Sequence, residues 1–235
     1  MEGRSHPLWD RSLAVEYFTK SLLEAGTFEY PLLESLSLRY DFRDGGSGGF
    51  SSFRNCSRLR KLQATHLYYP DLDLVDTANL TTLELVEYSG PSLNHLLVKC
   101  PLLETLIIAR FKYTPGHTSI PDSDSTVALL DAAVNNTDYD LSRLSHLDII
   151  IRDLGWTPNV IWSGLHLPAL THLSFQYWME SGEAIRELIE LLTRSKCVLQ
   201  RITVDLPKFE QGRWVEFLDG IAPVMAPDIC VVEKW

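Results

Sequence analysis

The sequence predicts an α/β repeat protein whose strands lie side by side in one parallel sheet. Three observations support this fold class: an apolar motif recurs along the chain, its spacing is nearly regular, and helical periodicity appears between several copies. Strands joined by about two dozen residues are most simply parallel, because a crossover of that length can return the chain to the same end of the sheet. We therefore expect residues 1–235 to form a single repeat domain.

The recurring motif is an apolar residue, two variable residues, a second apolar residue, one variable residue and a third apolar residue. Its seven copies occupy residues 33–38, 59–64, 80–85, 103–108, 144–149, 170–175 and 199–204, and 229–231 is a worn eighth copy. The middle residues of the seven copies are 26, 21, 23, 41, 26 and 29 residues apart. Most of these steps fit the range of about 20 to 29 that is typical of leucine-rich repeats. Seven to eight strand units between 33 and 232 thus predict a leucine-rich-repeat-like solenoid, or horseshoe.

In such a solenoid the parallel sheet lines the concave face, and helices or irregular connectors lie on the convex side. The clearest helix is predicted at 183–194, where apolar residues recur on one face: Ile185, Leu188, Ile189 and Leu192. Further helices are predicted at 92–99, 126–135 and 213–221, the second of them within a long connector, 111–140. We interpret 12–24 as an N-terminal helix, belonging to a repeat whose strand is missing.

The alternation of a strand predicts which side chains face the core. The middle and last residues of each motif point inward, because a single unit cannot bury its leucines without its neighbours. The intervening residues point onto the concave face, where the central copies are apolar and the outer copies are polar. We expect the partner-binding residues there to be Glu84, Val86, Ile107, Ala109, His146, Asp148, Ile150, His172 and Gln176. Alternatively, the long connector folds back and covers this patch, because large exposed apolar patches are uncommon.

Two histidines occupy the same motif position in consecutive copies. In-register strands would place His146 and His172 about 5 Å apart, with Asp148 on the same side. A metal site would need a third ligand and a second shell of hydrogen bonds, so we predict no metal there. A pH-sensitive binding patch and plain exposed polar residues both remain open.

No catalytic site and no cofactor are predicted. Ser47 lies in a G-x-S-x-G pattern at 45–49. A catalytic serine of this kind is followed by a strongly periodic helix, whereas the segment at 50–57 is short and polar. We interpret 45–49 as a flexible loop, which leaves a serine hydrolase as a remote alternative. The four cysteines lack the spacing of a zinc site or a disulfide framework.

The charge balance argues against nucleic acid as a partner. The formal net charge is −10, with 31 acidic residues against 21 lysines and arginines, whereas nucleic-acid binding needs clustered basic residues. The N-terminal segment has no uninterrupted apolar stretch typical of a secretory signal. No apolar run approaches the roughly 18 residues of a membrane span. We therefore expect a cytoplasmic or nuclear protein without a membrane partner.

Three segments resemble a known family. They are KCPLLETL at 99–106, LPALTHL at 167–173 and LLTRSKCVL at 191–199. They are similar to the leucine-rich regions of fungal F-box proteins, particularly those of basidiomycetes, and the resemblance covers roughly 22–204. In that family an F-box docks a ubiquitin-ligase adaptor, and the repeats select the substrate.

The resemblance implies a protein-binding module that recognises ubiquitin-ligase substrates. The F-box itself is not found, since no Leu-Pro-x-Glu start precedes the first repeat. Binding to a ubiquitin-ligase adaptor is therefore expected only if a longer product contains an F-box. The alternative is a structural scaffold or a degenerate F-box-like paralogue without a specific ligand.

Overall fold

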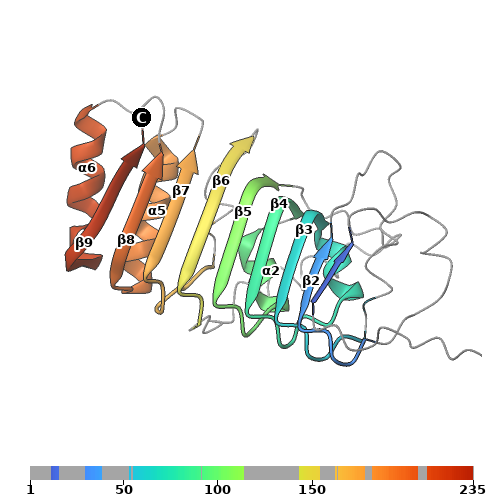
Figure 1. Cartoon of the computed structure of the whole chain (residues 1–235). Coiled ribbons are helices and arrows are strands. Elements are labelled where there is room, and N and C mark those ends of the chain that lie inside the picture. Colours follow the sequence, from blue (N-terminus) through green and yellow to red (C-terminus); the bar gives the residue numbers. More distant parts are fainter. Residues whose placement is uncertain are drawn as a thin grey trace, which may run out of the picture.

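The described chain forms one parallel sheet. The computed structural model describes residues 12–15, 30–38, 53, 55–90, 92–113, 143–153, 162, 164–177, 182–205 and 211–234. Nine strands follow one another in sequence order across the sheet, and every neighbouring pair is parallel (Figure 1). The predicted α/β class with a single parallel sheet is confirmed.

The strands are β1 Ser12–Val15, β2 Ser35–Leu38, β3 Lys61–Tyr68, β4 Thr82–Gly90, β5 Thr105–Tyr113, β6 His146–Asp153, β7 His172–Tyr177, β8 Leu199–Asp205 and β9 Met225–Lys234. The helices are η3 Tyr69–Leu74, α2 Leu93–Lys99, α5 Gly182–Ser195, α6 Gln211–Ile221 and η4 Ala222–Val224. The α-helices lie on one side of the sheet, and no helix among the described residues covers the opposite side, which we call the open face (Figure 1).

Three predicted helices are confirmed and one is wrong. The predictions at 92–99, 183–194 and 213–221 correspond to α2, α5 and α6, whereas 126–135 lies outside the described residues. The N-terminal helix at 12–24 is wrong at its start, because Ser12–Val15 is the strand β1. Leu13 and Val15 recur every second residue and pair with Leu36 and Leu38, so strand pairing decides the structure of this segment.

Equivalent motif positions pair with one another from strand to strand. The middle residues of the seven copies form one buried row: Leu36, Leu62, Leu83, Leu106, Leu147, Leu173 and Ile202. The worn eighth copy continues the register, since Val231 of β9 pairs with Ile202, but Val231 is 37% exposed and does not extend the buried row. Each fully buried leucine contributes about 1.5–3 kcal/mol relative to an exposed one.

Backbone carbonyls that each accept two hydrogen bonds from the next unit fix this register. The carbonyl of Glu34 accepts hydrogen bonds from the backbone N–H groups of Arg60, at 2.8 Å, and Lys61, at 3.0 Å. The carbonyl of Arg60 does the same for the next unit, with Thr81 at 2.8 Å and Thr82 at 2.9 Å. The same arrangement continues at the start of each later strand up to β8. Each strand is therefore held at a fixed height relative to its neighbour.

Hydrogen bonds also join the connectors of neighbouring units on the helix side of the sheet. The Thr77 hydroxyl donates to the carbonyl of Lys99 at 2.6 Å. Further along, the backbone N–H of Leu167 donates to the buried Ser195 hydroxyl at 3.0 Å. These bonds satisfy backbone groups that burial would otherwise leave unpaired.

Three cysteines lie at turns of the chain just before strands. Cys56, Cys100 and Cys197 are buried and form no disulfide. Burial raises the pKa of the Cys56 and Cys197 thiols to about 11 and that of Cys100 to about 12. Because the thiolate is the reactive form of cysteine, these side chains act as small apolar fillers.

Asp71 is a buried carboxylate in η3. Its Oδ2 accepts a hydrogen bond from the backbone N–H of Tyr68 at 3.0 Å, and its Oδ1 has no hydrogen-bond partner among the described residues. Burial raises the pKa of Asp71 to about 6, although the Tyr68 bond opposes this change. The folded protein therefore holds the Asp71 proton more tightly than the unfolded chain does.

This linkage predicts a pH-dependent stability. Between about pH 4 and pH 6, the folded state binds more protons at Asp71, so the free energy of unfolding falls as the pH rises through this window. The neutral variant Asp71→Asn should lose this contribution and be less sensitive to pH. Urea denaturation of both proteins from pH 4 to pH 7 measures the difference. Parallel pH profiles for the two proteins would contradict it.

Candidate functional site: the open face of the sheet

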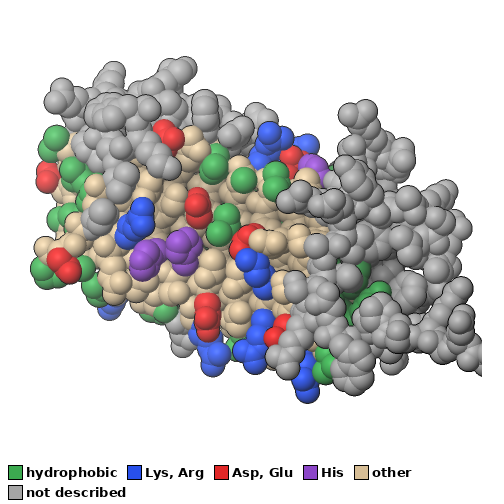
Figure 2. Space-filling model, viewed as in Figure 1, with side chains coloured by type: hydrophobic (Ala, Val, Ile, Leu, Met, Phe, Trp, Pro, Cys, Tyr) green, Lys and Arg blue, Asp and Glu red, His purple; other side chains and the backbone are tan. Residues whose placement is uncertain are grey.

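Outward side chains form rows across the open face. The first row, near the amino ends of the strands, contains Ser35, Lys61, Thr82, Thr105, His146, His172 and Arg201. The second row contains Ser37, Gln63, Glu84, Ile107, Asp148, Ser174 and Thr203. Figure 2 shows this face, where charged side chains surround scattered apolar ones.

All nine residues of the predicted site lie on β4 to β7, and none is buried in the core. Val86 is 55% exposed, whereas the other eight are partly buried: Glu84, Ile107, Ala109, His146, Asp148, Ile150, His172 and Gln176. The structure therefore brings the predicted residues together on neighbouring strands of one surface. That this surface binds a partner stays a prediction.

A bend in β3, β4 and β5 shapes the centre of this surface. Core positions in these strands are separated by three residues instead of two, as in Leu85 to Tyr88 and Ile108 to Phe111. Two successive residues therefore escape burial in each strand, which exposes Val86. The neighbouring β6 keeps the two-residue spacing, so the register between β5 and β6 shifts beyond Ile108. Strict alternation does not predict this bend.

The central apolar patch consists of Val86, Ile107, Ala109 and Ile150. These residues come from β4, β5 and β6, which are adjacent in the sheet. Ile107 pairs directly with Glu84 on one side and Asp148 on the other. The patch therefore lies directly against charged side chains. The connector predicted to cover it, 111–140, lies outside the described residues beyond Tyr113.

Glu84 is held by two neighbours on β3. Lys61 Nζ lies 2.6 Å from its Oε1, and Gln63 Nε2 donates to its Oε2. Partial burial by itself would raise the pKa of Glu84, but the hydrogen bonds from Lys61 and Gln63 outweigh burial and lower it. The carboxylate consequently stays ionised and fixed beside the apolar patch.

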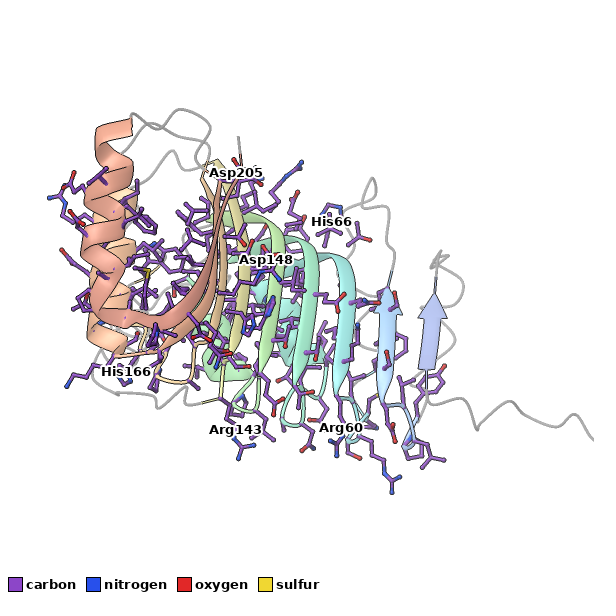
Figure 3. All side chains as sticks on the ribbon, turned by 60° about the vertical axis from the view of Figure 1, so that its left-hand side comes forward. Arg60, His66, Arg143, Asp148, His166 and Asp205 are labelled. Atoms are coloured by element: carbon purple, nitrogen blue, oxygen red, sulfur yellow. The ribbon has the colours of Figure 1, made fainter. Side chains whose placement is uncertain are left out.

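The carboxyl-terminal parts of the strands hold further paired charges. Glu87 binds Arg110 Nη1 at 3.1 Å, and His66 Nδ1 lies 3.8 Å from the same carboxylate. Gln176 Nε2 donates to Asp205 Oδ2 at 2.7 Å. In Figure 3, Asp205 lies near the carboxyl ends of the strands and Asp148 midway along them.

The two histidines stack as their register predicts. The ring centroids of His146 and His172 are 5.7 Å apart, and the ring planes differ by 17°. The Thr171 hydroxyl donates to the Ser145 carbonyl at 3.1 Å and lies 2.9 Å from His172 Nδ1. This contact engages Nδ1 of His172 and leaves its Nε2 available to a partner. No three metal-ligating side chains gather among the described residues.

The predicted site omits Arg201, which the register places beside His172. Arg201 is exposed on β8 and follows His146 and His172 in the first row. Its motif position is the same as theirs, so the repeat alignment itself could have identified it. Sequence reasoning instead grouped Arg201 with the polar residues of the outer copies.

Other predicted features lie beyond what the structure describes. Ser47 and the glycine-rich segment 45–49 are outside the described residues, so the hydrolase hypothesis is not tested. The same holds for the side chain of Cys230. As for membranes, none of the helices described here has both the length and the apolar character needed to cross a bilayer.

Comparisons with protein-family models, with curated proteins and with solved structures find no match for this chain. They therefore assign it to no family. What the chain binds has to be inferred from the side chains of the open face.

The contacts of Glu84 lead to a testable prediction. Lys61→Met removes the cation and one hydrogen bond while burial remains, so the pKa of Glu84 should rise. Titration of the carboxyl ¹³C signal of Glu84 by NMR measures this change. Lys112→Met, an exposed lysine elsewhere on β5, is the matched control and should leave the titration unchanged. An identical Glu84 titration in Lys61→Met would contradict the contact.

Proposed function

We propose that the chain is a leucine-rich-repeat-type solenoid that binds another protein through its open sheet face. It resembles the substrate-recognition repeats of an F-box ubiquitin-ligase subunit. The observation that carries the binding role is the grouping of Val86, Ile107, Ala109 and Ile150 on one open surface, surrounded by charged side chains. No catalysis is assigned to the chain.

The in-register sheet supports the solenoid part of this proposal. Each described unit contributes one strand to the sheet, and most units differ in length by only a few residues. The buried leucines of one unit pair with those of the next, so the units share one continuous core. This is the arrangement expected when units stack along one direction and contact mainly their neighbours.

The composition of the open face supports the binding part. Protein-binding surfaces combine an apolar centre, where most of the affinity arises, with a polar rim that excludes water. Here the rim includes the Lys61–Glu84 pair and the His146–His172 stack. An ordered rim lowers the conformational entropy lost on binding, because its side chains are already positioned.

The ubiquitin-ligase role rests on the sequence resemblance. In this proposal the open face would select a substrate protein in the cytoplasm or nucleus. A ubiquitin-ligase adaptor would bind only a longer product that contains an F-box.

A structural scaffold without a specific ligand is the second candidate function. The observation that favours it is the internal pairing of several face charges, such as Lys61 with Glu84 and Gln176 with Asp205. A surface whose polar groups satisfy one another has less need of a partner. The two functions differ in whether the apolar patch contributes to binding.

The decisive experiment charges the apolar patch. Ile107→Asp combined with Ile150→Asp should reduce recovery of bound proteins at least tenfold in a quantitative pull-down, because both carboxylates would be desolvated on binding. Val198→Asp combined with Val215→Asp makes the same chemical change at two valines that are 59% and 55% exposed, away from the patch.

The control variant should recover the same proteins as the unmodified chain. Thermal melting checks that all three proteins are folded. If the Ile107/Ile150 variant recovers every protein as well as the unmodified chain does, binding through the open face is wrong and the scaffold role is favoured.

A further inference from the structure

The first row of the open face differs in charge from the rest of the surface. Its members from Ser35 to Arg201 include no carboxylate, although the whole chain has a formal net charge of −10. The row holds two lysine or arginine side chains, Lys61 on β3, next to Ser35, and Arg201 on β8, at its other end. Lys61 already has a carboxylate partner in Glu84, whereas Arg201 has no carboxylate partner among the described residues.

The Arg201 backbone N–H donates to the Thr171 carbonyl, but no hydrogen bond or ion pair joins the Arg201 guanidinium to another residue that the structure describes. Other charges on this face, such as Glu84, Arg110 and Asp205, are each bound to a neighbour. An exposed guanidinium offers five N–H donors in a fork that matches a carboxylate. Arg201 thus has side-chain donors that no described residue uses, in a row without a carboxylate.

The two histidines extend this donor set. His172 lies next to Arg201, and His146 stacks on the far side of His172. Strands in a sheet lie about 4.8 Å apart, so the three side chains span about 10 Å. The Thr171 hydroxyl contacts His172 Nδ1, which leaves Nε2 of His172 for a bound group. Figure 2 shows two histidines side by side on this face, next to a basic side chain.

The second row contains a carboxylate on the same strand as His146, namely Asp148. It follows His146 by two residues on β6, and its carboxylate makes no hydrogen bond or ion pair with the described residues. An acceptor of this kind suits a backbone N–H of a bound segment. At physiological salt, a bound charge interacts weakly with protein charges more than about 8 Å away. The side chains next to the binding position therefore determine which charge is favoured there, more than the net charge of −10 does.

We propose that the open face recognises an acidic protein segment, with an aspartate or glutamate of the partner seated on His146, His172 and Arg201. An apolar side chain of the same segment packs on the adjacent patch at Ile107 and Ile150. This inference rests on the proposed protein-binding function and specifies the chemistry of the partner.

A random 12-residue peptide library, selected on the immobilised full chain, tests the inference. Peptides enriched by the unmodified protein should combine Asp or Glu with apolar residues. Arg201→Glu should weaken binding of the enriched acidic peptides at least tenfold. Arg186→Glu makes the same charge change at an exposed arginine of α5, on the helix side, and should leave their affinity unchanged.

The outcomes separate this inference from the proposed function. Enrichment of neutral or basic peptides, lost in the Ile107→Asp, Ile150→Asp variant, would overturn the acidic partner and leave binding through the open face intact. Acidic peptides that bind Arg201→Glu as tightly as the unmodified chain would also overturn it. Enrichment that neither the Ile107/Ile150 variant nor Arg201→Glu alters would remove both proposals.

Discussion

The structure depends on the register between neighbouring parallel strands. One carbonyl at the start of each strand binds two N–H groups of the next, from Glu34 to Thr171 along the chain. These paired hydrogen bonds oppose sliding of one strand along the next. A shift of one residue would move the leucines of a strand from the core face to the open face. The buried row from Leu36 to Ile202 exists because the register is the same at each step.

The same register organises the surface that we propose to be functional. Stacking the leucines on the helix side also stacks the alternate residues on the open face, which brings His146 onto His172 and places Arg201 beside them. The apolar patch needs a second feature, the bend that turns two successive residues outward in β4 and β5. Core packing and the composition of the binding surface are therefore two results of one pairing pattern.

Much of this arrangement could be predicted from the sequence, because leucine spacing directly encodes which strands pair. The prediction of a helix at 12–24 was wrong at Ser12–Val15, since so short a segment fits a helix as well as a strand. The bend was missed because strict alternation was assumed, although Tyr88 and Phe111 offered an apolar residue three positions after the last motif residue. Arg201 was omitted because the other outward residues of the outer copies are polar, although its motif position matches those of His146 and His172, and the pairing with His172 shows its place.

Cross-linking across two strands tests the register most directly. Thr82 and Thr105 are paired on the open face, whereas Ile107 lies two residues further along β5. A disulfide requires Cα atoms within about 7 Å, so Thr82→Cys with Thr105→Cys should oxidise readily, and Thr82→Cys with Ile107→Cys should not. The native cysteines at 56, 100 and 197 are buried and should not compete, and Cys230 is replaced by serine in both proteins. Faster oxidation of the offset pair would contradict the register on which the rows, the patch and the proposed binding surface all depend.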